Sequence, residues 1–272
     1  MMVKTVIFDL DGTLLDTSEG VVECVRYAAR TLGCPLPPRE QLLLFIGPPL
    51  SISFPQYLGL DEQSTAEAIR LFREHYQAGA MFLARPYDGI FTLCETLQAQ
   101  GIRMAVATNK LEPSARKLLN HFGFDRYCDP IRGADPENRL KKADLIRLCL
   151  EEHRIAPEQA VLIGDTEFDA EGAAEAGVPF LAVTYGFGFR GPEDLGARPC
   201  LGMVGTPEEA ASLLLKDVRR IGLMLGHPAA LFIMEAGRTG DVRIFPQSRI
   251  RGLLFSYRLS IMIDIEAYPI LS

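Results

Sequence analysis

The sequence predicts an α/β fold: a doubly wound, mostly parallel sheet with an inserted all-helical cap domain. Three observations predict it: a short apolar strand near the amino terminus, a long helical stretch directly after it, and an alternation of apolar runs with helices beyond Gly101. Parallel strands need crossover helices, and those crossovers are right-handed. The alternation therefore indicates a sheet with helices on both faces.

The first strand ends in two closely spaced carboxylates. Val3, Val6, Ile7 and Phe8 predict a short buried strand, and the sequence Asp9-Leu10-Asp11-Gly12-Thr13 follows it. Open α/β sheets bind ligands at the carboxyl ends of their strands, so both carboxylates should emerge at such a site. This pattern predicts a site for magnesium and phosphate, in which one aspartate attacks and the other moves protons.

Residues 17–82 are expected to be entirely helical. One apolar face marks a helix that ends at Gly33, and a second long helix is expected from about Glu62 to Gly79. Gly47, Pro48 and Pro49 break the helical pattern between them. From the residues alone, this turn is a simple helix break.

The rest of the core should alternate strands with helices. Residues 85–89 suggest a hinge, with Asp88 placed to cap a helix from Gly89 to Gln100. The core domain is predicted to comprise residues 1–16 and 83–216. Strands are expected at 102–107, 160–163 and 178–183, and further helices at about 112–122, 141–153, 168–176 and 207–216.

Residues 217–272 are predicted to be a separate C-terminal extension. From Arg219 onward there are seven arginines, four acids and no lysine. The apolar run from Ile221 to Met234 is broken by His227 and Pro228, and it is shorter than the roughly 20 residues of a membrane span. Two interpretations stay open: a packing or oligomer-forming segment, and an extension that is out of frame or foreign to the natural protein.

Composition narrows the classes of partner. The net charge of −7 gives no basic surface for nucleic acid or for an anionic membrane, so the expected partner is a small molecule. We expect a monomer or a homodimer. The six cysteines are scattered singly and without a CxxC pair, which indicates reduced thiols. The first strand begins without a secretory leader, so we expect a cytoplasmic protein.

Further polar residues lie where strands end or helices begin. Thr108 and Asn109 follow one predicted strand, Lys141 and Lys142 begin a helix, and Gly164-Asp165-Thr166-Glu167-Phe168-Asp169 follows another strand. A hydroxyl and backbone amides can bind phosphate oxygens, an ammonium can neutralise the transferring group, and carboxylates can hold magnesium. Glycines in the sequence Tyr185-Gly186-Phe187-Gly188 are expected to serve a tight loop rather than a nucleotide site.

With these motifs in order over residues 3–215, the chain resembles the haloacid dehalogenase superfamily, in the branch of phosphoglycolate phosphatase-like enzymes. The resemblance implies a Rossmann-like core, with Asp9 as the nucleophile that becomes an aspartyl-phosphate and Asp11 as the general acid and base. Thr108, with Asn109 beside it, would bind phosphate together with Lys142, for which Lys141 is an alternative one residue away. Magnesium would be held by Asp165, Asp169, the Asp9 side chain and the Asp11 main-chain carbonyl.

The resemblance implies a magnesium-dependent phosphatase of small phosphomonoesters, with phosphoglycolate as the default substrate. Alternatives are a 5'-nucleotidase acting on nucleoside monophosphates and a β-phosphoglucomutase-like phosphotransferase. A dehalogenase is disfavoured because those enzymes lack the second aspartate, here Asp11. A non-catalytic binding module is disfavoured because no charged motif residue is missing, although fold alone never proves activity. Gly47 and Pro48 are candidate substrate-facing residues of the cap.

Overall fold

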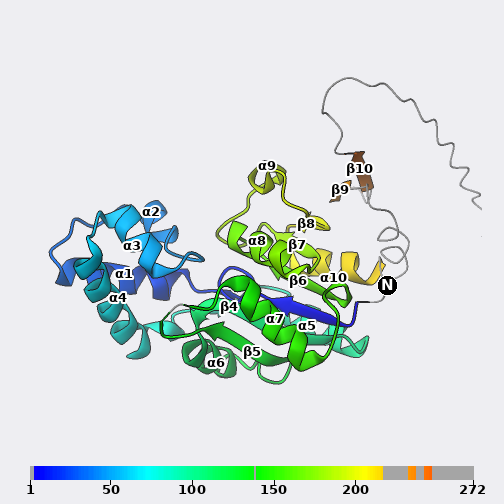
Figure 1. The fold of residues 1–272 in the computed structure, drawn as a ribbon, viewed down its shortest axis with the longest axis horizontal. Coiled ribbons are helices and arrows are strands. Elements are labelled where there is room, and N and C mark those ends of the chain that lie inside the picture. The colour runs from blue at the N-terminus through cyan, green and yellow to red at the C-terminus, as the bar shows by residue number, and fades with distance from the viewer. Residues whose placement is uncertain (1–2, 138, 217–231, 237–241, 247–272) are drawn as a thin grey trace, which may run out of the picture.

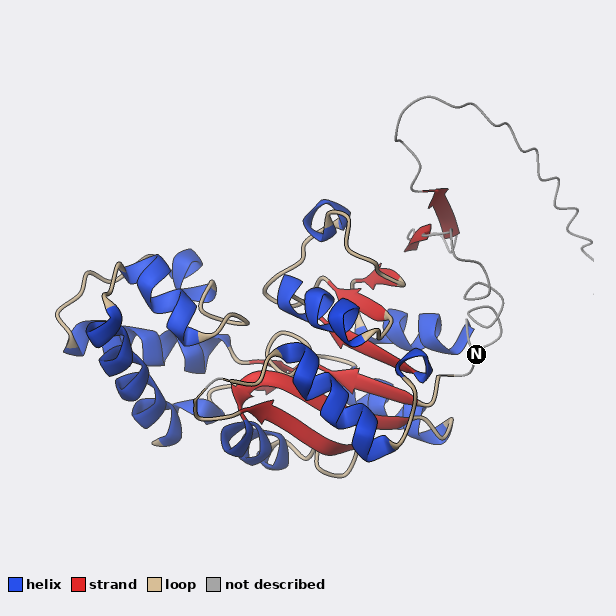
Figure 2. Ribbon diagram, viewed as in Figure 1, coloured by secondary structure: helices blue, strands red, loops and turns tan. Residues whose placement is uncertain are grey.

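The computed structural model describes residues 3–137, 139–216, 232–236 and 242–246, and it confirms the predicted α/β architecture (Figures 1 and 2). Its centre is a six-stranded sheet in the order β5-β4-β1-β6-β7-β8. Every pair of neighbours in this sheet is parallel. The strands are β1 (Thr5–Phe8), β4 (Arg103–Leu111), β5 (Cys128–Ala134), β6 (Ala160–Gly164), β7 (Phe180–Val183) and β8 (Gly202–Val204).

Helices cover both faces of this sheet. Consecutive strand residues point to opposite sides, so an apolar strand has two faces to bury. Val6 and Phe8 pack in one hydrophobic cluster with residues of three helices, α5 (Ile90–Ala99), α6 (Glu112–His121) and α10 (Pro207–Lys216). Ile7 packs in another cluster with residues of α7 (Lys142–His153) and α8 (Glu167–Ala176). Both sides of β1 are therefore buried, as its uninterrupted apolar sequence predicts. The core also contains the short helix α9 (Pro192–Leu195) and the 3₁₀ turn η2 (Pro157–Gln159).

The strand order creates a switch point beside β1. The chain passes from β1 to β4 and β5 on one side of the sheet, and then returns to β6, β7 and β8 on the other. Connections that leave in opposite directions open a crevice at the carboxyl ends of the strands between them. The residues that follow β1 and β6, and those at the end of β4, therefore meet at one place.

A helical unit lies beside the sheet (Figure 1). In the sequence it is inserted between strands β1 and β4. It contains α1 (Ser18–Thr31), α2 (Arg39–Leu43), α3 (Leu50–Leu58), α4 (Glu62–Gln77) and the 3₁₀ turn η1 (Ala80–Phe82). The chain enters and leaves it through β2 (Leu15–Asp16) and β3 (Arg85–Pro86), which pair antiparallel. Arg85 also forms an ion pair of 3.1 Å with Asp16 across this ribbon. The two connections are thus tied together rather than free.

The structure corrects four details of the sequence analysis. Strands β5 and β8 were not predicted, because β5 contains Asp129, Pro130 and Gly133 and β8 has only three residues. Strand β4 continues past residue 107 to Leu111, since pairing with β5 extends it. Asp88 does not cap α5, which begins after a left-handed Gly89 with no side-chain cap.

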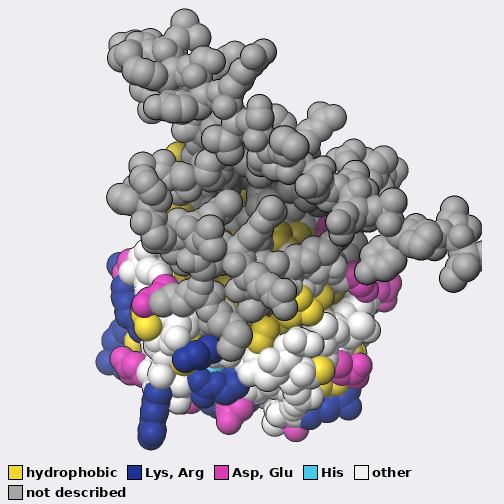
Figure 3. Space-filling view, turned by 90° about the vertical axis from the view of Figure 1, so that its right-hand side faces the viewer, with side chains coloured by type: hydrophobic (Ala, Val, Ile, Leu, Met, Phe, Trp, Pro, Cys, Tyr) yellow, Lys and Arg dark blue, Asp and Glu magenta, His cyan; other side chains and the backbone are white. Residues whose placement is uncertain are grey.

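The predicted extension 217–272 lies outside the described residues, apart from β9 (Phe232–Ala236) and β10 (Val242–Pro246), which pair antiparallel. Among the helices that the structure describes, none combines the length and the apolar character that a membrane crossing requires. On the coloured part of the face in Figure 3, basic and acidic side chains lie interspersed. That part of the surface carries no extended patch of one charge.

Packing of the sheet predicts a large cost for truncating Leu162, which is fully buried in β6. Leu162→Ala should lower the free energy of unfolding by about 2–5 kcal/mol, because it removes buried methyl groups and leaves a cavity. Leu83→Ala is the matched control. Because Leu83 is 51% exposed, this substitution should lower the free energy of unfolding far less. Urea unfolding of both variants measures the difference, and equal losses would show that the sheet is not packed as described.

Candidate active site

Asp9 and Lys142 form a buried ion pair at the end of β1. Asp9 directly follows the strand, and its backbone N–H donates to the carbonyl of Ile163 in β6 at 2.9 Å. Lys142 begins α7, and its Nζ donates to Asp9 Oδ1 at 2.6 Å and to the carbonyl of Ala107 at 2.8 Å. Lys141 is exposed and precedes the helix, so Lys142 is the lysine that the fold brings to Asp9.

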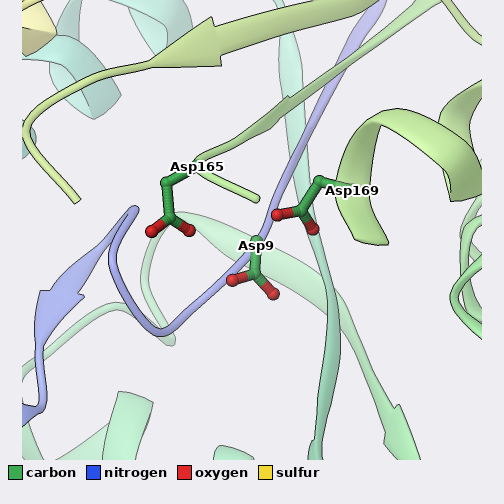
Figure 4. Close-up of side chains that lie close together, drawn as sticks. All are labelled: Asp9, Asp165 and Asp169. Atoms are coloured by element: carbon green, nitrogen blue, oxygen red, sulfur yellow. The ribbon is translucent and has the colours of Figure 1, made fainter. Parts of the chain in front are cut away.

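Two further carboxylates, Asp165 and Asp169, lie beside Asp9 (Figure 4). Asp165 follows β6 and Asp169 lies in the first turn of α8, and each of the three residues offers a carboxylate oxygen within 4.8 Å of the others. All three side chains are buried. The sheet and one helix therefore concentrate negative charge in a small volume, as the two aspartate motifs predict.

Backbone and hydroxyl donors hold one oxygen of Asp165 and one of Asp169. Asp165 Oδ2 accepts the amides of Phe187 at 2.6 Å and Gly188 at 3.2 Å. Asp169 Oδ2 accepts the Thr166 amide at 3.0 Å and the Thr166 hydroxyl at 2.7 Å, which also caps α8. Helix capping is thus one role of Asp169, in addition to its place among the carboxylates.

The second oxygens of these carboxylates fit a divalent cation. Asp165 Oδ1 is buried and has no hydrogen-bond partner, and Asp169 Oδ1 lies 2.7 Å from Lys142 Nζ without hydrogen-bonding geometry. Leaving a buried carboxylate oxygen unpaired is costly. Carboxylate oxygens are the ligands that Mg²⁺ prefers, so a cation would satisfy these atoms. Within the described part of the chain, Asp9, Asp165 and Asp169 form the one acidic cluster of this kind.

Mutual repulsion and burial shift the pKa values at this site. Burial raises the pKa of Asp9 to about 7; Lys142 opposes the rise, and the nearby carboxylates of Asp169 and Asp11 add to it. Burial, and then Asp169 and Asp9, raise the pKa of Asp165 well above its ordinary value. Burial alone would lower the pKa of Lys142, but the carboxylates of Asp169 and Asp9 raise it. The lysine therefore stays charged.

Asp11 stands apart from the three carboxylates. The Thr17 hydroxyl donates to Asp11 Oδ1 at 2.5 Å, and Lys110 Nζ lies 3.1 Å from Asp11 Oδ2. Lys110 also lies 4.6 Å from the ring centre of Tyr76 in α4. Lys110 was missed by the sequence analysis. Its position two residues after Thr108 was the available signal, but nothing local indicated a pairing with Asp11.

Thr108 and Asn109 lie inside β4 rather than after it. The buried Thr108 hydroxyl accepts the Lys110 amide at 3.2 Å. The side-chain amide of Asn109 donates to the carbonyl of Gly47 at 3.3 Å, which joins the sheet to the helical unit. Gly47 has a φ of 101°, a left-handed conformation that favours glycine, and a Cβ there would press on the Thr166 side chain.

One cavity brings these residues together between the sheet and the helical unit. Asp9, Asp11, Thr108, Asn109, Lys142 and Asp169 line it from the core side, and Gly47 and Pro48 line it from the helical unit. Asp165 is fully buried and does not line the cavity. All of the predicted site residues except Asp165 therefore surround a single space.

The loop Tyr185–Gly188 holds Asp165 in place, a role that the sequence analysis missed. Its amides bind Asp165 Oδ2, and a Cβ at Gly186 or Gly188 would overlap Asp165. Tyr185 donates its hydroxyl to the carbonyl of Thr13, beside the first aspartate motif. The glycines thus permit the close approach of this loop, whereas the sequence alone indicated only a tight turn.

Several known proteins are similar to this chain in sequence or in structure. Residues 6–183 match the family model described as haloacid dehalogenase-like hydrolase. The tyrosine-protein kinase PtkA of Mycobacterium tuberculosis is 39% identical over 68% of this chain, which spans only 63% of the length of that relative. A 5'-nucleotidase of Pseudomonas aeruginosa is 40% identical over 67% of this chain and 83% of its own length. The crystal structure of a predicted phosphatase from Clostridium acetobutylicum superposes with a TM-score of 0.75 at 34% identity, covering 79% of this chain and 100% of that one.

The unpaired oxygen of Asp165 generates a stability prediction. In buffer without divalent cations at pH 8, the free energy of unfolding of Asp165→Asn should exceed that of the unsubstituted protein by about 1–3 kcal/mol. The variant should therefore unfold at a higher temperature. The asparagine oxygen can still accept the amides of Phe187 and Gly188, while a buried charge is removed. Calorimetric melting measures the effect, with the exposed Asp125→Asn as a control that should change little.

The contribution of Asp9 and Asp165 to folding stability should fall as the pH rises. The folded-state pKa of Asp9 is raised from 3.8 to about 7, and that of Asp165 is also raised, so the folded protein binds more protons than the unfolded chain between these values. The stability that Asp9 contributes is fully present below pH 3.8 and is lost as the pH rises through about 7, and Asp165, whose pKa is also raised, contributes with the same sign. Asp165→Asn should flatten this loss, and Mg²⁺ should stabilise the unsubstituted protein more than the variant. A variant that melts lower than the unsubstituted protein at pH 8 would contradict the described geometry.

Proposed function

Because the chain belongs to the haloacid dehalogenase-like hydrolases, we propose that it is a magnesium-dependent phosphatase that hydrolyses small phosphomonoesters through an aspartyl-phosphate on Asp9. The observation that carries this proposal is the position of Asp9: buried, 2.6 Å from Lys142 Nζ, beside Asp165 and Asp169, and on the wall of a cavity. The 5'-nucleotidase and the predicted phosphatase among the similar proteins support a phosphomonoesterase.

The carboxylates of Asp9, Asp165 and Asp169 would hold Mg²⁺, together with the main-chain carbonyl of Asp11. When bound, the ion would neutralise charge on the transferring phosphoryl group. The unpaired Asp165 Oδ1 and the raised pKa of both Asp9 and Asp165 support this assignment, because a cation would favour their charged forms.

Asp9 would attack phosphorus with a carboxylate oxygen. A carboxylate repels a dianionic phosphate ester, so the attack needs positive charge and hydrogen-bond donors around the phosphate. Lys142, held by Asp9 and Asp169, supplies a fixed ammonium at this place. Thr108 and Asn109, which line the same cavity, would bind the remaining phosphate oxygens.

Asp11 would act as general acid and base. It lines the cavity, yet its carboxyl group does not belong to the cluster of three carboxylates. Asp11 would give a proton to the leaving alkoxide as the P–O bond breaks, and would then take a proton from the water that attacks the aspartyl-phosphate. Thr17 and Lys110 hold both oxygens of Asp11 and so fix its orientation.

Residues 17–82 would form the cap domain of this enzyme, with residues 1–16 and 83–216 as the core. Gly47 and Pro48 line the cavity from the helical side, and the hydrogen bond from Asn109 to Gly47 joins the two parts. A cap over the site would exclude water and limit the substrate to small molecules. We also propose that the protein acts in the cytoplasm, where phosphorylated metabolites are available.

Nucleoside monophosphates are a second candidate substrate class. The specific observation in their favour is the 40% identity to a 5'-nucleotidase. Phenylalanines 45 and 72 line the cavity and offer aromatic surface against which a base could pack. A screen of phosphate release from phosphoglycolate, nucleoside monophosphates and sugar phosphates, with and without Mg²⁺, separates the classes. Transfer of the phosphoryl group to a sugar, instead of its release, would indicate a mutase.

The nucleophile assignment predicts the behaviour of Asp9→Asn. Magnesium-dependent phosphate release should fall at least about a thousandfold, because an amide cannot form the covalent intermediate. The Asp125→Asn protein serves as the matched control and should keep full activity, since Asp125 is an exposed residue outside the cavity. Unchanged phosphate release by Asp9→Asn would show that another group attacks the substrate.

A further inference from the structure

Helix α4 presents one continuous face to the cavity that contains Asp9. The lining residues of this helix follow the spacing i, i+3, i+4, i+7 and i+8, which places them on one side of a helix. They are Ile69, Phe72, Arg73, Tyr76 and Gln77. Arg73 is the only charged residue that the helical unit contributes to the cavity wall.

Arg73 differs from the two lysines in this cavity, because among the described residues it has no hydrogen-bond or ion-pair partner. Lys142 is paired with Asp9 and Asp169, and Lys110 is paired with Asp11. Within the described ranges of the chain, neither a hydrogen bond nor an ion pair involves Arg73. Its side chain is partly buried, and burial lowers its pKa without a carboxylate to oppose the shift.

A partly desolvated guanidinium without a counter-ion favours an anion. Arginine remains charged at all physiological pH values, and its planar donors match the two oxygens of a carboxylate. Arg70, one turn earlier on the same helix, shows the contrast: it is exposed, does not line the cavity, and is paired with Glu67 and Glu74. The cavity therefore has one cation beyond those engaged by its own acids.

Resting on the proposed phosphatase function, we propose that Arg73 binds a carboxylate of the substrate while the phosphoryl group lies at Asp9 and Lys142. One guanidinium matches the single charge of a carboxylate, whereas a second phosphate would call for more cations than this wall supplies. Gln77 follows Arg73 by one helical turn on the same face and offers an amide donor beside it. The substrate class is thus a small phosphomonoester that carries a carboxylate, in preference to a nucleoside monophosphate.

Calorimetric titration with non-hydrolysable phosphonates tests this assignment in the presence of Mg²⁺. Phosphonoacetate carries a carboxylate, and 2-hydroxyethylphosphonate is a partner of similar size without one. Arg73→Gln should weaken phosphonoacetate binding about tenfold to a hundredfold, as expected for loss of a charged hydrogen bond. Its affinity for 2-hydroxyethylphosphonate should stay within about twofold, which also shows that the variant is folded. Arg73→Lys should be intermediate, and Arg70→Gln should match the unsubstituted protein for both ligands.

Equal weakening of both ligands by Arg73→Gln, or no weakening of either, would overturn the assignment. So would a failure of the unsubstituted protein to bind phosphonoacetate more tightly than 2-hydroxyethylphosphonate. Phosphate release is measured separately, over the same screen of phosphoglycolate, nucleoside monophosphates and sugar phosphates with Mg²⁺. If the unsubstituted protein discriminates between the two phosphonates through Arg73 but releases no phosphate, the proposed phosphatase function fails while the carboxylate site stands.

Discussion

The burial of three carboxylates around a single ammonium is the constraint on which the rest of the site depends. Buried charge is costly unless it is paired, and Lys142 cannot balance Asp9, Asp165 and Asp169 together. The fold lowers this cost with the amides that hold Asp165 and Asp169. The negative charge that remains fits a divalent cation, which would offset it.

The end of β4 connects this charged centre to the helical unit. Three successive residues have different partners there: Thr108 faces the cavity, Asn109 binds the Gly47 carbonyl, and Lys110 pairs with Asp11 and lies over Tyr76. Tyr76, which lies against Lys110, and Arg73 are on the same face of α4, so this helix contacts the lysine that pairs with Asp11 and also carries the cation that would select the substrate. Chemistry and specificity are thereby linked through a few side chains.

Local patterns predicted the parts of the site that depend on neighbours in sequence. A strand followed by Asp9, a strand followed by Asp165, and a helix that begins at Lys142 are local signals, and parallel strands bring their ends together. Strand β5, the Lys110 pairing and the amides of Phe187 and Gly188 were missed because they depend on partners distant in sequence. Asp88 had the right residue type for a cap, but the left-handed Gly89 occupies the capping position.

Covalent phosphorylation of Asp9 would be revealed by trapping the aspartyl-phosphate. Asp11→Asn should accept a phosphoryl group from acetyl phosphate, whose leaving group needs no proton, and should then hydrolyse the intermediate slowly for lack of a base. After acid quenching, mass spectrometry of the peptides measures where the group resides. We expect one phosphoryl group on Asp9, formed only with Mg²⁺ and released by hydroxylamine. An unmodified protein that still turns over substrate, or a phosphoryl group on another residue, would contradict it.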